Sequence, residues 1–428
     1  MADRKGACLT VAIRLAVAIA LAGALAGQAR ADTACRAQAH AYGIVEIGGK
    51  GVKATISELV SAPEGSSGSC DLNVLNEFDA LNTDPVDPAS RDKTIAAIGQ
   101  QRDRILAWAP AHHLAIAGND IFYVLSSGMA NLRKDNPAYW NELKERIADK
   151  TGEQPAVISA EDEASLTFDG VANVEKCYRR SQVALIDVGS SNTKGAYLNY
   201  DPDAPNCTWA NLGLQHVTFQ IPWGTVTLER KIAASAHGEA AFRTGLETFI
   251  ADEIATYLTV TVARDGDNKG GFRTRSRVYL AGGIPYTLAT FAHPEDRGPD
   301  VRLSADDIDD FYADLKDRPA CVTGFLDASL SRKDCRLKSR LARIDDPQTR
   351  KDVTAEMSDI VRNIFTTQDQ LLAGAGLLKA IADQWDFKDR RIFFMRQSRH
   401  SWMLGYLLQK FGNRSDVPRQ FLPAAPPR

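Results

Sequence analysis

The chain has 428 residues, which suggests about two domains at roughly 150 residues per domain. Its composition, with 44% hydrophobic and 25% charged residues, excludes wholesale disorder and is typical of a globular protein. The net charge of −3 excludes attraction of polyanions by bulk positive charge, so an anion site must be built locally from backbone N–H groups, cations or a metal.

The N-terminal residues 1–31 differ from the rest of the chain. Basic residues precede an apolar run of 13 residues at 15–27, and Ala29-Arg30-Ala31 then offers an A-x-A cleavage site. This is the three-part pattern of a secretory signal peptide, and the run is too short to cross a ~30 Å hydrocarbon core as a helix. We therefore expect cleavage after Ala31, a periplasmic or secreted protein without stable membrane insertion, and a mature net charge of −6.

Strands and helices alternate along the first half of the chain. A strand, a tight glycine turn at 48–51 and a returning strand predict a hairpin. Asp87-Pro88 and Asn136-Pro137 each predict a helix start, because proline suits the first helical position. The other expected elements are a strand from about 70, a strand ending near 125, a short strand at 156–159 and the acidic cluster Glu161-Asp162-Glu163.

The same pattern restarts in the second half with another strand, turn and returning strand. The expected strands are at 182–187, 193–199, near 217, 277–281 and 391–395, and the expected helices are at 240–258, 371–382 and 402–411. We therefore expect one domain at 36–175, a second at 181–412 and a loose Pro-rich tail at 413–428.

The restart is an internal repeat. Glu46-Ile47-Gly48-Gly49 is followed by Lys53, seven residues after the acid, and Asp187-Val188-Gly189-Ser190 is followed by Lys194 at the same spacing. One acidic-aliphatic-glycine turn is most often a plain hairpin. Two such turns 141 residues apart, with a later strand that runs into Gly282-Gly283, favour a duplicated phosphate-binding architecture.

Two glycine turns that face each other across a cleft can clamp phosphates, because glycine lets phosphate oxygens reach backbone N–H groups. Glu46 and Asp187 are predicted to hold Mg²⁺ through water, since magnesium keeps much of its hydration shell beside phosphates. No nucleic-acid-binding motif is visible. The predicted phosphate-binding residues are Gly48, Gly49, Lys50, Gly51, Gly189, Ser190, Ser191, Asn192, Thr193, Gly282 and Gly283.

The sequence resembles the exopolyphosphatase and guanosine-pentaphosphate phosphohydrolase family of the actin, sugar kinase and heat-shock superfamily. The matching stretches are VEIGGKGVKATI, YVLSSGMANLRK, VISAEDEASLTFDGV, LIDVGSSNTKGAYL, VYLAGGIPYTLA and LLAGAGLLKAIAD. The resemblance implies an α/β fold with two ribonuclease H-like (actin-like ATPase) domains and an interdomain phosphate-binding cleft. The resemblance also implies that Glu163 is the base that activates water. Without the resemblance, the acids at 161–163 indicate a solvated helix start.

The leading hypothesis is an exported Mg²⁺-dependent hydrolase that releases terminal phosphate from polyphosphate or a polyphosphorylated nucleotide, and we allow for a homodimer. Departures from the family motifs, at Glu46, Gly49, Lys50, Ser190 and Ser191, keep a second hypothesis open. In that hypothesis a decayed site holds a phosphate-rich ligand or a partner. A third hypothesis is an ATP-dependent kinase of the same superfamily, with Gly282-Gly283 at the adenosine.

Six cysteines remain after removal of the signal segment, and an even number in an oxidising compartment predicts disulfides. Cys177 and Cys207 each lie fifteen residues from Asn192, so an antiparallel hairpin would place them opposite each other. Six reduced thiols are the alternative. The expected pairs are Cys177–Cys207, Cys321–Cys335 and Cys35–Cys70.

Overall fold

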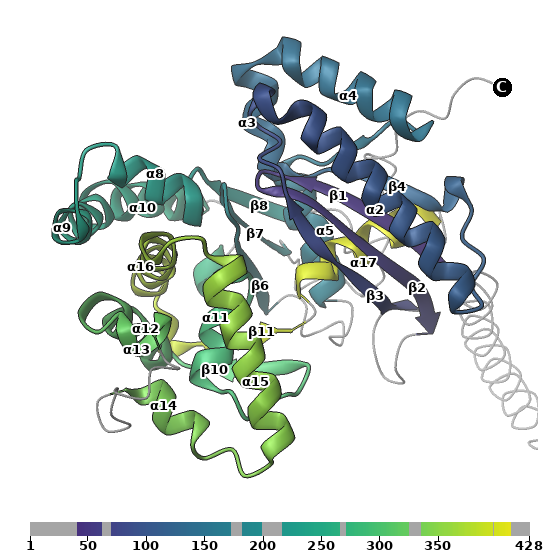
Figure 1. The fold of residues 1–428 in the computed structure, drawn as a ribbon. Helices are drawn as coiled ribbons and strands as arrows, with labels where there is room; N and C mark the ends of the chain where they lie inside the picture. The colour runs from purple at the N-terminus through teal and green to yellow at the C-terminus, as the bar shows by residue number, and fades with distance from the viewer. Residues whose placement is uncertain are drawn as a thin grey trace, which may run out of the picture.

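The computed structural model describes residues 41–61, 70–172, 182–198, 216–265, 271–324, 335–396 and 398–411. They form two β-sheets flanked by helices, and the two sheets are the centres of two domains (Figure 1). The expected signal segment and the Pro-rich tail lie outside the described residues. Within the described part of the chain, no helix combines the length and the apolar character that a membrane span needs.

The first sheet has five strands in the order β3-β2-β1-β4-β5. The predicted hairpin is confirmed, since β1 and β2 pair antiparallel and close at Gly48 and Gly51. Asn136 caps the predicted second helix and Gly152 ends it in the left-handed conformation. The strands are β1 Ala41–Gly48, β2 Gly51–Ser61, β3 Cys70–Asn82, β4 Ile121–Leu125 and β5 Ala156–Val157, and the helices are η1 Pro88–Ser90, α2 Arg91–Ala111, η2 Gly118–Asp120, η3 Ser127–Met129, α3 Ala130–Asp135 and α4 Pro137–Thr151.

The second sheet has six strands in the order β10-β11-β9-β6-β7-β8, and its hairpin β6–β7 repeats the topology of β1–β2. In each sheet the first hairpin strand also pairs parallel with a later strand, β4 or β9. The strands are β6 Val183–Val188, β7 Thr193–Leu198, β8 His216–Ile221, β9 Arg277–Gly282, β10 Asp300–Leu303 and β11 Arg391–Met395.

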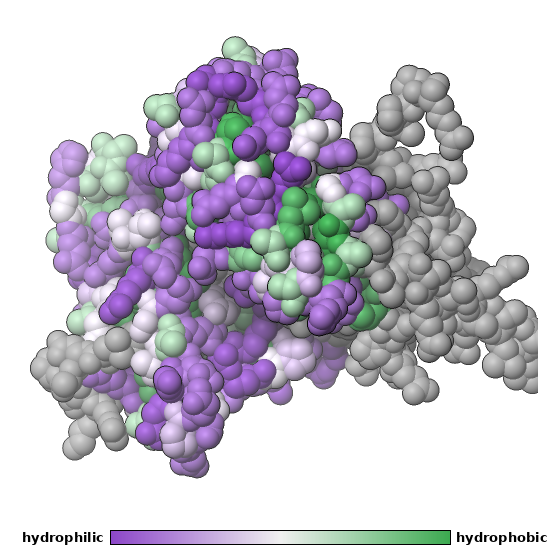
Figure 2. Space-filling view, turned by 45° about the vertical axis from the view of Figure 1, so that its right-hand side comes forward, coloured by the Kyte–Doolittle hydropathy of each residue, from purple (hydrophilic) through white to green (hydrophobic). Residues whose placement is uncertain are grey.

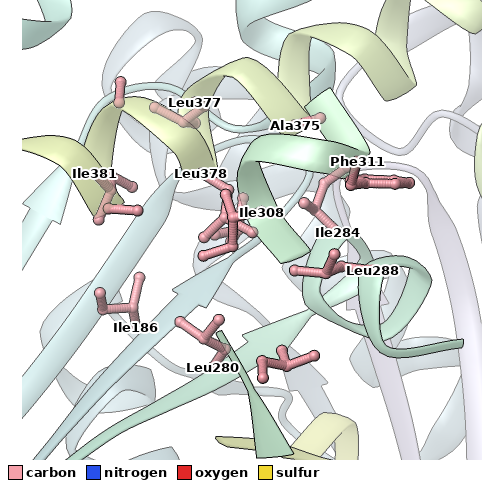
Figure 3. Close-up of a cluster of buried hydrophobic side chains, with 14 of the residues drawn as sticks. Ile186, Leu280, Ile284, Leu288, Ile308, Phe311, Ala375, Leu377, Leu378 and Ile381 are labelled. Atoms are coloured by element: carbon pink, nitrogen blue, oxygen red, sulfur yellow. The ribbon is translucent and has the colours of Figure 1, made fainter. Parts of the chain in front are cut away.

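Most helices of the second domain pack on one face of this sheet. Figure 3 shows Ile186 and Leu280 from the sheet meeting side chains such as Ile284, Ile308 and Leu378 from three helices. The helices are α8 Thr225–Ala233, α9 Glu239–Phe249, η4 Ile250–Ile254, α10 Ala255–Asp265, η5 Phe272–Thr274, α11 Gly283–Ala292, α12 Ala305–Asp317, α13 Ala320–Thr323, α14 Arg336–Leu341, α15 Pro347–Asp359, η6 Ile360–Ile364, α16 Gln368–Gln384 and η7 Phe387–Asp389.

Helices α5, Ala160–Ala172, and α17, Ser398–Phe411, connect the two sheets. Leu166 of α5 packs with Trp402 of α17 against the first sheet, whereas Phe168 of α5 packs against the second. The two helices cross closely, because a Cβ on Gly170 would lie 2.0 Å from the backbone oxygen of Ser401. Helix α17 lies beside α5 in Figure 1. Helix α17, expected within the second domain, therefore packs on the first sheet.

The alternation of side chains along the strands decides which residues face α5. Ile44 packs toward α5 and α17, whereas Val45 packs toward α2 and α4, so Glu46 points to the α5 side. In the second sheet Leu185 faces α5 and Ile186 faces the other core. Asp187 therefore also points toward α5.

The described residues show a largely hydrophilic face and contain one of the three predicted disulfides. Hydrophilic residues dominate the face in Figure 2, and Val157 and Val260 are exposed large hydrophobic side chains in the described part of the chain. Cys321 and Cys335 form a disulfide between α13 and α14, with Cα atoms 5.2 Å apart, which confirms that predicted pair. Cys35, Cys177 and Cys207 lie outside the described residues, and Cys70 begins β3.

Candidate functional site

The two hairpins place an acid opposite a lysine at equivalent positions. Glu46 pairs with Lys53 across β1–β2, and Asp187 pairs with Lys194 across β6–β7. Because residues opposite each other in an antiparallel pair point to the same face, each lysine lies on the α5 side with its acid. The equal sequence spacing thus becomes an equal register in the two sheets.

Glu163 reaches this region from the start of α5. The helix begins with reciprocal hydrogen bonds, in which Asp162 N–H donates to Ser159 Oγ and Ser159 N–H donates to the Asp162 carboxylate. This is a capping box, which fixes the first turn of a helix. Glu163 follows in that first turn and is buried. The cap therefore aims the Glu163 side chain at the ends of the strands rather than at solvent.

Lys194 joins the two carboxylates. Its Nζ lies 2.8 Å from Asp187 Oδ2 and 3.0 Å from Glu163 Oε1, and its side chain is only 4% exposed. Glu163 Oε2 also accepts a hydrogen bond of 2.9 Å from the backbone N–H of Ser127, just after β4. Strands β6 and β7, helix α5 and the end of β4 thus supply one buried polar cluster, Asp187–Lys194–Glu163.

The charges of this cluster stabilise each other. Burial raises the pKa of the Glu163 carboxyl, but the charge of Lys194 and the hydrogen bonds from Ser127 outweigh it and hold that pKa below 4.5. Burial lowers the pKa of the Lys194 ammonium, but Asp187 and Glu163 outweigh it and keep that pKa above 10.5. Lys194 and Glu163 are therefore both ionised at neutral pH.

Three turns meet above the cluster. A Cβ on Gly49 would lie 2.7 Å from Ser191 Oγ, and a Cβ on Gly128 would lie 3.0 Å from the Gly49 nitrogen. Asn192 Nδ2 also donates to Ser127 Oγ at 3.5 Å. The turns at 48–51, 126–128 and 189–192 are therefore in direct contact, and glycine is needed at Gly49 and Gly128 for this close approach.

The turn at 189–192 also forms hydrogen bonds with the start of α8. Thr225 N–H donates to Gly189 O at 3.0 Å, and Val226 N–H donates to Ser190 O at 2.8 Å. The hydroxyl of Thr227 donates to Ser191 O at 2.9 Å. Thr193, a predicted phosphate ligand, donates its hydroxyl to Trp223 O at 2.9 Å. The backbone carbonyls of this turn thus accept hydrogen bonds from donors in the first turn of α8.

Lys50 at the first turn crosses to the second domain. Its Nζ donates to Ile364 O at 3.0 Å, at the end of η6, and to Gln370 Oε1 at 3.3 Å. Burial is the main reason that its pKa falls to about 8, and Lys53 lowers it further. The ammonium therefore fastens the first hairpin to the end of a helix, where cations are favoured.

The remaining predicted residues lie at the ends of strands and at the start of α11, and of these Gly282 contacts the cluster. Gly48 ends β1, and a Cβ there would lie 3.5 Å from Glu46 Oε1. Gly51 begins β2 against Leu81 O. Gly282 ends β9 with φ +96°, and a Cβ there would lie 2.7 Å from Asp187 Oδ1, while Gly283 begins α11.

The two carboxylates predicted to hold Mg²⁺ through water do not form a direct-coordination site for that ion in this arrangement. Asp187 is already bonded to the Lys194 ammonium, and Glu46 lies 3.8 Å from Lys53 Nζ. A magnesium ion needs oxygens at about 2.0–2.1 Å around a common centre. Among the described residues, no group of three or more His, Cys, Asp and Glu side chains is placed to hold a metal ion.

Lys194 belongs to the sequence repeat but is not among the site residues that the sequence predicts. The signal was present, because its spacing from Asp187 equals that of Lys53 from Glu46. Ser127 was also given no role in the site, since its contact with Glu163 uses the backbone N–H rather than the side chain.

The fold is similar to that of several solved structures. No protein-family model and no curated protein matches this sequence. The structure is similar to that of a Ppx/GppA family member from Aquifex aeolicus, with a TM-score of 0.54 and 14% identity over 87% of this chain and 99% of that one. It is also similar to an exopolyphosphatase from Cytophaga hutchinsonii, with a TM-score of 0.53 and 12% identity over 89% and 99% of the two chains.

An exopolyphosphatase-like protein gives a TM-score of 0.51 and 14% identity over 88% of this chain and 99% of that one. The resemblance found in the sequence is thus confirmed in the structure, and so is the predicted two-domain α/β fold. Identities of 12–14% show a shared fold and leave the activity to be argued from the site itself.

Proposed function

We propose that this protein binds the phosphate groups of a phosphoric anhydride, such as polyphosphate or a polyphosphorylated nucleotide, and does not hydrolyse them. The observation that carries the proposal is the position of Lys194 between Asp187 and Glu163. The lysine reduces the combined charge of the two carboxylates from −2 to −1. It also keeps a third ammonium hydrogen that is not needed by either carboxylate.

Phosphate would approach this ammonium from the second turn. A Cβ on Gly189 would lie 2.9 Å from Asn192 O and 3.9 Å from Lys194 Nζ, so this turn lies next to the ammonium and has no room for a side chain. Solved structures with this fold include exopolyphosphatases, and their likeness supports phosphate as the ligand class. Glycine-rich turns add backbone N–H groups, which bind anions without net charge.

Hydrolysis is not favoured, because its two chemical requirements are met poorly. A general base works best when its pKa lies near the working pH, and the pKa of Glu163 is instead held low by Lys194 and Ser127. Phosphoryl transfer also needs cations that neutralise charge on the transferred group. Lys194 is paired with two carboxylates, so the cluster as a whole has no excess positive charge that could neutralise a transferred phosphoryl group.

A second candidate is the predicted Mg²⁺-dependent, exopolyphosphatase-like hydrolase. The observation in its favour is the location of Glu163, which lies where the turns of both sheets meet and faces Asp187 through Lys194. That activity would require Lys194 to leave at least one of its carboxylates.

Export remains part of the proposal. The signal-peptide pattern of residues 1–31 supports it. The Cys321–Cys335 disulfide supports it as well, since disulfides persist in oxidising compartments such as the periplasm.

The test compares binding with turnover in purified mature protein. Phosphate release is measured on polyphosphate, ATP and guanosine pentaphosphate with Mg²⁺, and binding of the same ligands is measured by titration calorimetry. We expect binding without release. If the wild type releases phosphate and Glu163→Gln does not, the protein is a hydrolase. If the wild type neither binds nor hydrolyses any of the three ligands, both candidate functions are wrong.

A further inference from the structure

We infer that Lys194 is a built-in substitute for a divalent cation, and that its removal turns Asp187 and Glu163 into a metal site. The ammonium is the group that brings these two carboxylates together from different parts of the fold, β6 and α5. The inference concerns the chemistry of the cluster, and only its consequence for ligand binding rests on the proposed function.

The geometry of the cluster resembles that of a bound cation. Oxygens from two carboxylates point at one buried centre at 2.8 and 3.0 Å. A Mn²⁺ or Mg²⁺ ion at that centre would need these oxygens about 0.8 Å closer, at roughly 2.1 Å. Such a shift is within reach of rotations of two carboxylates whose backbones stay in place.

The electrostatics explain why a cation is required there. Two carboxylates that point at one buried centre repel each other unless a cation lies between them. Lys194 supplies a positive charge that is covalently fixed and cannot dissociate. A divalent ion would supply more charge, but it would have to displace an ammonium that has two short ion pairs and almost no exposure.

The first hairpin provides a matched control. Lys53 has the same register as Lys194, but its Nζ lies 3.8 Å from Glu46 and its side chain is 59% exposed. Removal of Lys53 should therefore create no metal site of the same kind. Glutamine suits both positions, because it removes the charge, keeps most of the length and offers a neutral oxygen.

The experiment titrates Mn²⁺ into wild-type protein, Lys194→Gln and Lys53→Gln by calorimetry, and records the melting temperature of each with and without Mn²⁺. We expect Lys194→Gln to bind Mn²⁺ at least tenfold more tightly than the other two proteins. Its melting temperature alone should rise with Mn²⁺, because a ligand that binds the folded state stabilises it. Equal Mn²⁺ binding by wild type and Lys194→Gln would overturn the inference, and so would a folded Lys194→Gln that binds no Mn²⁺.

A second variant covers the case in which Lys194→Gln does not fold. Lys194→Gln/Glu163→Gln keeps one carboxylate, so it should fold without metal and show no gain in Mn²⁺ affinity. Failure of this double variant to fold would show that Lys194 acts through packing rather than charge, which contradicts the inference.

Titration of polyphosphate with EDTA present then tests the consequence for the ligand. Wild-type binding should be unchanged by EDTA, and Mg²⁺-dependent binding would overturn the metal-independent site. If no variant binds polyphosphate, the proposed function fails, whereas the Mn²⁺ titration still decides the role of Lys194.

Discussion

The hairpins β1–β2 and β6–β7 are built alike but differ in the environment of their acid–lysine pairs. Both pairs have the same spacing and the same register. Lys53 is 59% exposed and 3.8 Å from Glu46, whereas Lys194 is 4% exposed and 2.8 Å from Asp187. The difference comes from α5, which covers the second pair and adds the Glu163 carboxylate.

The register of each acid–lysine pair and the stability that the pair contributes are therefore set by different parts of the sequence. Register depends on the distance of each residue from its turn, which is local. The strength of an ion pair depends on what covers it, because exposed pairs contribute about 0–1 kcal/mol while breaking a buried pair costs about 3–5 kcal/mol. One repeat has thus become a long pair between a buried glutamate and an exposed lysine, and the other a cluster in which the lysine is buried as well.

The largest effect is expected for Lys194→Met. Loss of the ammonium leaves two buried carboxylates without a partner, so the free energy of unfolding at pH 7 should fall by about 3–5 kcal/mol. The equivalent Lys53→Met should change it by less than about 1 kcal/mol. Urea denaturation of both variants measures the comparison, and equal losses would remove the distinction between the two hairpins.

The effect of Lys194→Met should depend on pH. The Glu163 pKa is lowered by folding, so the stability from its ion pair is present above pH 4.5 and is lost as the pH falls through the folded-state pKa. The Lys194 pKa is raised by folding, so its contribution is fully present below pH 10.5 and is lost as the pH rises through the higher folded-state pKa. The difference between wild type and variant should therefore be constant near neutral pH and shrink in acid. Unfolding curves from pH 3 to 8 measure it, and a difference that grows in acid would contradict the charge argument.

Glu163→Gln is expected to have an intermediate effect. The new amide would keep a hydrogen-bond acceptor for Ser127, and Lys194 would keep Asp187, so the expected loss is about 1–3 kcal/mol. The matched Glu46→Gln should cost less than Glu163→Gln, because Glu46, although buried, is paired only at 3.8 Å with a lysine that is 59% exposed. Thermal or urea unfolding measures both losses of stability. A larger loss for Glu46→Gln than for Glu163→Gln would show that the first hairpin, rather than the second, contains the more stabilising carboxylate.

The smallest effect concerns the contact between the two turns. A Cβ on Gly49 would lie 2.7 Å from Ser191 Oγ, so Gly49→Ala should cost about 1 kcal/mol through overpacking. Adding Ser191→Ala removes that oxygen and should restore part of the loss. A double variant that is no more stable than Gly49→Ala would show that the turns are not in contact in solution.

Much of the fold was predictable from local signals. The hairpins, the caps at Asn136 and Gly152 and the Cys321–Cys335 pair depend on residues close together in sequence, and the structure has them. The position of Glu163 could be expected only from the family resemblance, because the acids at 161–163 alone are typical of an ordinary helix start.

The rest of the site depends on contacts between distant segments. Lys50 bonds to Ile364 and Gln370, which are 314 and 320 residues away. Lys194 is buried because α5 packs across the second sheet while α17 returns to the first. No periodicity or spacing near Lys194 specifies these contacts, so the sequence alone did not predict the ion pairs of Lys194 with Asp187 and Glu163.

Diffraction from crystals grown with Mn²⁺ tests the central claim most directly, since anomalous scattering locates the ion without assumptions about ligands. We predict that wild-type crystals contain no manganese at the cluster and that Lys194 Nζ remains within hydrogen-bonding distance of both Asp187 and Glu163. An anomalous peak between these carboxylates, with the Lys194 side chain displaced, would contradict the account and restore the metal-dependent hydrolase.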